Sequence, residues 1–381
     1  MIINDVLIGK NGWLFHGQGS NRWLEYLQGN LEIENNCLSD WKCHLSLWHE
    51  ILKKRVKRHA FVVVPEKHTV LRHLLPAGFF PEGIDVGTRF CAAVQTPIVN
   101  LAYEMEGIRH SELLYCKTDS HWSAAGAALA YGAICNALEI EALPITFECH
   151  EKLRWRGDLG RKLKPARGEW IETITPIHDI VLEFSNSVNN VGYISLKSCP
   201  SALIKGTLLL IGNSFCTSHL ANLLAQTFEK TIFMFSNSID DRLIDDFDPQ
   251  FCVFQTNERF LCVAPNNKTN DSNICRLVAK IMISDVPLLE RQSLLRYPSF
   301  LHDLVKRLLS EEGDKGALFH TSLSPSAIWA VGLAVERRAE ARRLLIELGH
   351  DLEEAREDFM LHYAEAHLDQ PQRVMRMSTY R

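Results

Sequence analysis

Two side chains of this sequence have the types and the spacing of an acid–base pair. Asp119 and His121 stand two residues apart in the segment KTDSHWSAAGA. If that segment is extended, both side chains point to the same side. The acid can then hold one nitrogen of the imidazole while the other nitrogen faces a hydroxyl, as in acyl transfer by a serine. In the other interpretation, Asp119 only caps the following helix and His121 packs against it.

The hydroxyl that suits this pair belongs to Ser214, in the segment LLLIGNSFCTSHL. The pattern predicts an apolar strand that ends at Gly212, after which Asn213 and Ser214 open a helix. A serine at such a turn stands at the sheet edge, where its own N–H and the helix N-terminus can stabilise an oxyanion. The alternative is that Ser214 is simply the N-cap of that helix.

The elements that would position these residues alternate between helices and strands. Apolar residues at helical spacing predict a helix from Leu38, capped by Ser39, and residues 123–138 predict a second helix, capped by Ser123. Residues 150–200 are rich in loop residues and indicate an insertion or an edge hairpin. Short apolar runs predict buried strands in FVVVPEK, SELLYC, GTLLLIG, TIFMFSN and FCVFQTN. This alternation predicts an α/β fold with a parallel sheet flanked by helices on both faces.

The pattern changes near residue 270, after which the sequence is helical and richly charged. We therefore expect one domain over residues 1–270, with the site at the carboxyl ends of its strands, and an all-helical domain over residues 271–381. We interpret the charge runs of the second domain as solvated faces. Self-association, docking of a protein partner and formation of a lid are all open roles for it.

Composition excludes several classes of protein. The chain has 381 residues, a formal charge of -5 and 46% hydrophobic residues, which is typical of a globular protein and not of a nucleic-acid binder. No apolar stretch approaches the roughly 20 residues that span a bilayer. The first residues lack the pattern of a signal peptide, which predicts a cytoplasmic protein. The 11 cysteines lack CxxC spacing, so we expect reduced core cysteines and no metal site; a secreted protein with disulfides is the alternative.

Several stretches resemble, in the same order, the alginate O-acetyltransferase-like branch (AlgX/AlgJ type) of the SGNH hydrolase superfamily. They are GKNGWLF from Gly9, VVPEKHTV from Val63, TDSHW from Thr118, WRGDLGRKL from Trp155, LLIGNSF ending at Phe215, and NERFL from Asn257. In that family the acid and the histidine precede the serine, as they do here. The resemblance implies Ser214 as nucleophile, His121 as base and Asp119 as the acid that orients it.

The same resemblance implies an activity. It is a serine-dependent O-acetyltransferase that modifies a carbohydrate, in polysaccharide or surface-glycan biosynthesis, through an acyl-serine. The partners implied are a carbohydrate acceptor and an acetyl donor, either acetyl-CoA or an acetylated carrier, with no tightly bound cofactor. A carbohydrate acetylesterase, or a non-catalytic module that binds glycan or docks a partner, remains open. The chain departs from the family at Asn213, where an aspartate is usual, and in its missing signal, since relatives are usually periplasmic.

Four further residues are candidates for binding the oxyanion or the substrate: Gly212, Asn257, Arg259 and Trp122. The N–H of Gly212 or the amide of Asn257 could donate to the oxyanion, although Asn257 is equally suited to a turn. Arg259 could hold an acidic sugar or pair with Glu258. Trp122 could stack on a sugar ring or pack in the core.

The other polar residues near these motifs have structural interpretations. We expect Glu66 and Lys67 to form an ion pair at a strand end, although a place in the cleft is open to them. His219 and Cys216 are expected to pack on the helix that follows Ser214.

Overall fold

The structure is a computed structural model, and it describes residues 2–17, 19, 21–77, 79, 85–108, 110–217, 219–265, 267–284, 286–310 and 323–369. The chain divides into two compact units. The first comprises Met1–Leu182, Lys197–Phe233 and Pro249–Pro265. The second comprises Glu183–Leu196, Met234–Asp248 and Asn266–Arg381. The candidate site lies entirely in the first unit.

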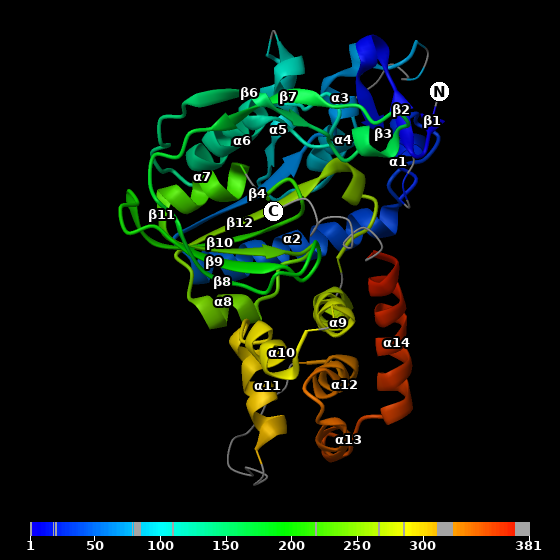
Figure 1. The fold of residues 1–381 in the computed structure, drawn as a ribbon, viewed down its shortest axis with the longest axis vertical. Coiled ribbons are helices and arrows are strands. Elements are labelled where there is room, and N and C mark those ends of the chain that lie inside the picture. Colours follow the sequence, from blue (N-terminus) through cyan, green and yellow to red (C-terminus); the bar gives the residue numbers. More distant parts are fainter. Residues whose placement is uncertain are drawn as a thin grey trace. The chain divides into compact units, whose positions relative to one another are not determined.

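A seven-stranded, mostly parallel sheet forms the centre of the fold, with the strand order β5-β4-β12-β10-β11-β9-β8 (Figure 1). Its strands are β4 (Arg58–Val64), β5 (Val99–Asn100), β8 (Val181–Ser185), β9 (Ile194–Ser198), β10 (Ile204–Gly212), β11 (Phe228–Phe235) and β12 (Phe251–Asn257). The neighbours β10, β12, β4 and β5 run parallel. Their carboxyl ends therefore meet at one edge, with Asn257 in register with Val64.

Helices cover both faces of this sheet, which fits the apolar runs AFVVV, LLLI and FCVF in its central strands β4, β10 and β12. Figure 1 shows α2 on one face and α6 and α7 on the other. All residues of β12 are buried, and Leu208 to Ile211 of β10 are 0% exposed. The helices of this unit are α1 (Trp23–Leu27), α2 (Asn35–Arg55), α3 (Lys67–Val70), α4 (Val86–Ala93), α5 (Leu101–Glu106), α6 (Ala124–Ala137) and α7 (His219–Thr227). The predicted α/β fold with a parallel sheet flanked by helices is confirmed.

Smaller elements complete the first unit. β1 (Ile2–Ile3), β2 (Val6–Ile8) and β3 (Leu14–His16) form a three-stranded sheet. β6 (Phe147–Trp155) and β7 (Glu169–Ile174) pair antiparallel as a hairpin inside the segment expected to be loop-rich. The short 3₁₀ helices are η1 (Lys10–Gly12), η2 (Arg72–Leu74), η3 (Ser111–Leu114), η4 (Gly160–Lys162) and η5 (Glu258–Phe260).

Three local predictions were wrong. The segment SELLYC is not a strand: η3 covers its first four residues, and Tyr115 makes only an isolated antiparallel bridge with Trp122. α2 begins at Asn35, so Ser39 lies inside the helix instead of capping it. The helix after Ser214 begins at His219, so Ser214 stands in a turn and is not the N-cap. Ser123, in contrast, caps α6 as predicted, accepting the N–H of Gly126 at 3.2 Å.

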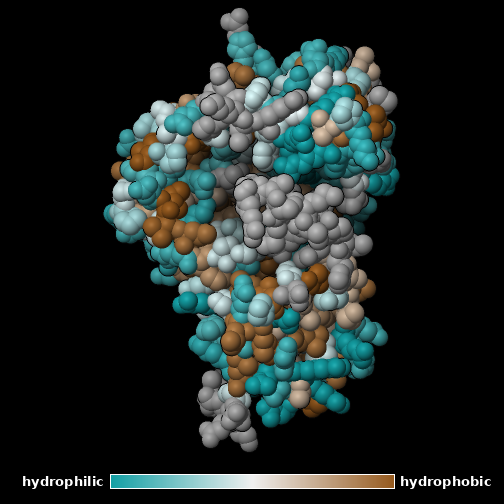
Figure 2. Space-filling view, in the orientation of Figure 1, coloured by the Kyte–Doolittle hydropathy of each residue, from teal (hydrophilic) through white to brown (hydrophobic). Residues whose placement is uncertain are grey.

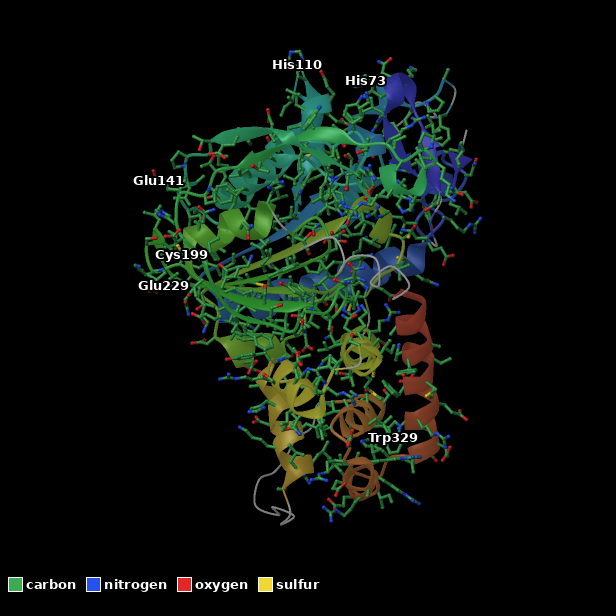
Figure 3. All side chains as sticks on the ribbon, viewed as in Figure 1. His73, His110, Glu141, Cys199, Glu229 and Trp329 are labelled. Carbon is green, nitrogen blue, oxygen red and sulfur yellow. The ribbon has the colours of Figure 1, made fainter. Side chains whose placement is uncertain are left out.

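The described residues of the second unit after residue 266 are mostly helical. Its helices are α8 (Arg242–Phe247), α9 (Asn267–Ile283), α10 (Leu288–Leu294), α11 (Ser299–Leu309), α12 (Pro325–Ala334), α13 (Arg338–Glu347) and α14 (Leu352–Asp369). A continuous apolar core joins α9 to α14, and Trp329 of α12, labelled in Figure 3, is 3% exposed within it. The described residues after Val263 form no strand, as predicted.

Some apolar surface of the second unit stays exposed. Figure 2 shows hydrophobic residues gathered near α10 and α12, and Leu289 is 80% exposed. No helix in the described part of the chain is long and apolar enough to cross a membrane.

Candidate active site

The structure brings the acid, the base and the serine into one chain of hydrogen bonds. The Oγ atom of Ser214 lies 2.8 Å from Nε2 of His121. Nδ1 of His121 lies 2.6 Å from Oδ1 of Asp119. The His121 side chain is 28% exposed and that of Asp119 is 9% exposed, so the serine end of the chain is the more open one. This is the geometry of a Ser–His–Asp arrangement.

Asp119 and His121 are held together by a bend and not by an extended strand. Oδ1 of Asp119 also accepts the backbone N–H of His121 at 3.0 Å, which is an Asx-type turn. The bend is closed behind it, where the N–H of Cys116 donates to the carbonyl of His121 at 3.2 Å. A local turn of this kind fixes both side chains relative to the same backbone.

Lys67 ties this bend to the end of β4. Its buried Nζ donates to the carbonyls of Cys116 and Asp119, both at 2.7 Å, and lies over the rings of Trp13 and Phe15. Burial lowers the pKa of Lys67 to about 8, although the nearby acidic groups act to raise it. The predicted ion pair between Glu66 and Lys67 is not what these contacts show: Lys67 is bonded to backbone carbonyls of the bend.

The β6–β7 hairpin supplies two carboxylates that hold the bend from the other side. Glu169 accepts the N–H of Lys117 at 2.6 Å and the hydroxyl of Thr118 at 2.7 Å. Asp158 accepts the N–H of Ser120 at 2.7 Å and its hydroxyl at 2.5 Å. Sequence reasoning missed both roles. Asp158 lies in a quoted motif, but nothing local to Glu169 marks it.

Asp119 is held as a carboxylate by four donors. Oδ1 receives the two His121 donors, and Oδ2 receives the N–H of Asp158 at 2.9 Å and the indole N–H of Trp155 at 3.3 Å. Burial alone would raise the pKa of Asp119, but the hydrogen bonds and charge of His121 keep it well below its usual range. Burial likewise opposes the charged form of His121, yet the bond to Asp119 leaves the pKa of His121 raised.

The turn that carries Ser214 is built from Gly212 and Asn213. A Cβ added at Gly212 would lie 2.6 Å from Sγ of Cys216 and 2.8 Å from Oε1 of Gln255, so a larger residue would have to displace these two buried side chains. The side-chain oxygen of Asn213 accepts the N–H of Phe215 at 3.1 Å, and the backbone carbonyl of Asn213 accepts the N–H of Cys216 at 2.9 Å. These bonds close the turn that follows β10 and leave Ser214 facing His121.

A buried chain of amides lies beneath this turn. Asn213 donates through Nδ2 to Oδ1 of Asn257, and Asn257 donates through Nδ2 to Oε1 of Glu66 at 2.5 Å. Asn257 is 0% exposed. Because the chain ends on a carboxylate, Asn257 has its nitrogen toward Glu66 and its oxygen toward Asn213, whose own nitrogen therefore donates. The oxyanion role of Asn257 stays a prediction.

Arg259 also joins Glu66 and not Glu258. Its Nε lies 3.5 Å from Oε1 of Glu66, and its buried Nη1 has no hydrogen-bond partner among the described residues. Glu258 instead accepts the N–H of Glu66 at 2.7 Å and the hydroxyl of Thr69 at 2.6 Å, and burial raises its pKa. The predicted pairing of Arg259 with Glu258 was therefore wrong.

The amide chain explains how an asparagine stands where relatives usually have an aspartate. We expect Asn213→Asp to destabilise the protein by about 1–3 kcal/mol at neutral pH. The new carboxylate either faces Oδ1 of Asn257 or turns that amide over, so that its oxygen faces Glu66. One acceptor-to-acceptor contact results in both cases. Urea unfolding of the two proteins measures the loss.

The double variant Asn213→Asp/Glu66→Gln is the control. A glutamine at 66 can donate to the turned Asn257, so we expect it to recover most of the lost stability. If Glu66→Gln lowers stability by the same amount in both backgrounds, the two positions are not coupled through Asn257.

The remaining predicted residues pack. Trp122 is 4% exposed, with its ring edge against Phe215 at 5.2 Å between centroids, so the indole is not available for a sugar in this structure. Cys216 is buried with Sγ 3.2 Å from Oε1 of Gln255, and burial raises its pKa above the usual range. His219 begins α7, half-buried, with its pKa lowered by burial.

Asp119, His121 and Asp158 also have the spacing of a metal site, since one ligand atom from each lies within 4.8 Å of the others. However, all four carboxylate oxygens already accept N–H or O–H groups of the protein. A cation would have to displace these bonds, and we assign no metal to the cluster.

The sheet and the serine at the end of its strand β10 define an SGNH hydrolase-like protein. The family model for "SGNH hydrolase-like domain, acetyltransferase AlgX" matches residues 6–241. The chain belongs to this AlgX family of SGNH hydrolase-like domains, as the sequence motifs predicted. No curated protein matches the chain in sequence.

Solved structures of Bacillus cereus PatB1 share this fold. Bacillus cereus PatB1 is similar with a TM-score of 0.53 and 18% identity, over 68% of this chain and 97% of that one. PatB1 with a sulfonyl adduct has a TM-score of 0.52 and 16% identity, over 69% and 97%. The O-acetyltransferase domain of Pseudomonas putida AlgJ has a TM-score of 0.44 and 16% identity, over 68% and 93%.

Proposed function

We propose that this protein is a serine-dependent O-acetyltransferase that acts on a carbohydrate in polysaccharide or surface-glycan biosynthesis. The observation that carries the proposal is the hydrogen-bond chain from Ser214 through His121 to a carboxylate held by four donors. Membership of the acetyltransferase AlgX family supports the acetyl group and the carbohydrate acceptor. The acetyl donor is an ester or thioester, such as an acetylated carrier or acetyl-CoA, and no tightly bound cofactor is required.

The first half of the reaction acylates the enzyme. Oγ of Ser214 attacks the acetyl carbonyl while Nε2 of His121 takes its proton, and Asp119 stabilises the imidazolium. The bond from the acetyl carbon to the donor then breaks, and His121 gives the proton to the leaving group. The product is acetyl-Ser214 with a neutral imidazole.

The second half transfers the acetyl group. A sugar hydroxyl attacks the acyl carbon of acetyl-Ser214 while His121 takes the hydroxyl proton. The Ser214 ester breaks, and the proton returns to Oγ. If water attacks instead, the same residues make an acetylesterase. In both halves the oxyanion is bound by the N–H of Ser214, with the N–H of Gly212 or the amide of Asn257 as the second donor.

Trapping the acyl-enzyme tests this proposal. Incubation with p-nitrophenyl acetate, followed by acid quench and peptide mass spectrometry, is expected to place an acetyl group on Ser214 of the native protein and none in Ser214→Ala. A sulfonyl fluoride is a second probe, supported by the sulfonyl adduct solved for PatB1. The proposal is contradicted if Ser214 stays unmodified with both reagents while p-nitrophenyl acetate is still hydrolysed.

The acceptor is decided in the same assay. Acetyl-Ser214 is chased with oligosaccharides or with buffer alone. Faster loss of the adduct in the presence of sugar, together with acetylated sugar, identifies the transferase, and an unchanged rate identifies the esterase. No adduct and no turnover would leave a non-catalytic glycan-binding or partner-docking module. A role of the helical unit in docking a partner or in self-association stays a prediction.

The pH dependence of acylation follows from the raised pKa of His121. Burial disfavours the imidazolium and Arg259 repels it, but Asp119 and Asp158 outweigh both, so the pKa lies above its ordinary 6.5. Only neutral imidazole can accept the Ser214 proton. We therefore expect kcat/KM to rise with pH and to level off above that pKa. A profile of initial rates checks this, and a midpoint below 6.5 would contradict it.

A further inference from the structure

Asp158 contacts the site without a part in the reaction described above. It follows β6, and its carboxylate accepts both donors of Ser120, at 2.7 Å from the N–H and 2.5 Å from the hydroxyl. Its own N–H donates to Oδ2 of Asp119 at 2.9 Å. Asp158 is therefore bonded to Asp119 and Ser120, two neighbouring residues of the bend.

The backbone around Asp158 is packed against the same bend. A Cβ added at Gly157 would lie 2.3 Å from the carbonyl oxygen of Thr118 and 2.6 Å from Cα of Asp119. The N–H of Gly160 donates to the carbonyl of Thr118 at 2.8 Å. Real Cβ atoms do not approach other atoms this closely, so only glycine at 157 lets the hairpin end reach the bend.

Ser120 links Asp158 to the base. It stands between Asp119 and His121, is 4% exposed, and its hydroxyl lies 3.4 Å from Nδ1 of His121. A buried hydroxyl of this kind is not a second nucleophile. Its donors are used by Asp158, so the position of Ser120 depends on that carboxylate.

We propose that Asp158 is a positioning residue for acyl transfer: it fixes Ser120, and with it the bend that aims His121 at Ser214, and it places a second negative charge beside the imidazolium. The proposal rests on the function proposed above. It assigns Asp158 no contact with the substrate. Its effect passes through Ser120 and through the charge felt by His121.

The charges that face His121 come from three parts of the chain. Asp119 in the bend and Asp158 after β6 favour the imidazolium, whereas Arg259 after β12 opposes it. An opposite charge within about 4–6 Å shifts the protonation of an imidazole substantially. Burial and Arg259 both lower the pKa of His121. With one acid alone instead of two, the pKa of His121 should therefore be raised less.

Glu169 offers a matched control for Asp158. Both are carboxylates of the hairpin region that accept a backbone N–H and a hydroxyl of the bend, Glu169 at Lys117 and Thr118. The charge of Glu169 acts on Lys67 and Cys116. Its removal therefore loosens the bend while leaving both acids beside His121 in place.

The experiment titrates His121 directly in the full-length chain. Histidine-labelled protein is followed by NMR, and the His121 signal is assigned by its loss in His121→Gln. In Asp158→Asn we expect the His121 pKa to fall by on the order of one unit. We expect kcat to fall about tenfold or more, with KM for p-nitrophenyl acetate nearly unchanged. Glu169→Gln should leave the His121 pKa in place.

The variant Ser120→Ala separates the positioning effect of Asp158 from the effect of its charge. It also replaces Asp158→Asn as the test variant if Asp158→Asn folds poorly. It removes the hydroxyl but keeps the Asp158 charge, so we expect a lower kcat with an unchanged His121 pKa. The proposal is overturned if Asp158→Asn leaves the pKa of His121 where it was, or if Ser120→Ala has the kcat of the native protein. The titration of His121 needs no turnover, so it tests the role of Asp158 separately from the proposed function. A native protein that never acylates Ser214 would refute the proposed function, whereas an unchanged His121 pKa in Asp158→Asn would refute the role of Asp158.

Discussion

Ser214→Ala is expected to lower kcat for acetyl transfer by about 10⁴- to 10⁶-fold. The substitution removes the atom that forms the acyl bond, while the bend that holds Asp119 and His121 is tied elsewhere, to Lys67 and Glu169. Oγ of Ser214 makes one hydrogen bond to His121. The variant should therefore unfold at nearly the native temperature. Initial rates with p-nitrophenyl acetate and a thermal melt measure the two quantities.

The double variant Ser214→Ala/His121→Ala shows whether the two residues act as one unit. A base without its nucleophile contributes almost nothing, so we expect the double variant to be about as slow as Ser214→Ala alone. Losses that multiply would mean that His121 acts on a different group. Activity of Ser214→Ala near the native level would place the nucleophile elsewhere.

The parts of this site that the sequence predicted are those set by local pattern. β4, β10 and β12 each contain an apolar run, AFVVV, LLLI and FCVF, and polar residues follow within a few positions. Parallel strands end at one edge, so Glu66, Asn213 and Asn257 had to lie close together. The pairing of Asp119 with His121 follows from their spacing, although an Asx-type turn achieves it and not an extended strand.

The parts that escaped prediction depend on tertiary contacts. Glu169 is 52 residues from Lys117, and only the pairing of β6 with β7 brings it to the bend. SELLYC has the apolar content of a strand, but its Tyr115 finds only Trp122 as a bridge partner. Arg259 pairs with Glu66 because the carboxylate of Glu258 already accepts the N–H of Glu66 and the hydroxyl of Thr69.

Asp119→Asn is expected to lower kcat by about 10⁴-fold. All four contacts to Asp119 come from donors: the N–H and ring of His121, the N–H of Asp158 and the indole of Trp155. An asparagine must turn its NH₂ toward one pair of them. If it faces His121, the ring must accept at Nδ1 and carry its proton on Nε2, where it cannot take the Ser214 proton.

If the NH₂ instead faces Asp158 and Trp155, two pairs of donors oppose each other, and the bend loses stability. In both cases the variant lacks the charge that raises the pKa of His121, so the remaining activity should titrate at lower pH than in the native protein.

Stability changes with pH in a way that checks the same contacts. The pKa of Asp119 is lowered in the folded protein, so its contribution to stability is present above about 3.8 and is lost as the pH falls below that value. Urea unfolding at neutral and acidic pH should therefore show a smaller acid effect in Asp119→Asn than in the native protein. An equal effect in both proteins would mean that the four donors do not hold a carboxylate, and the tautomer argument for His121 would fail with it.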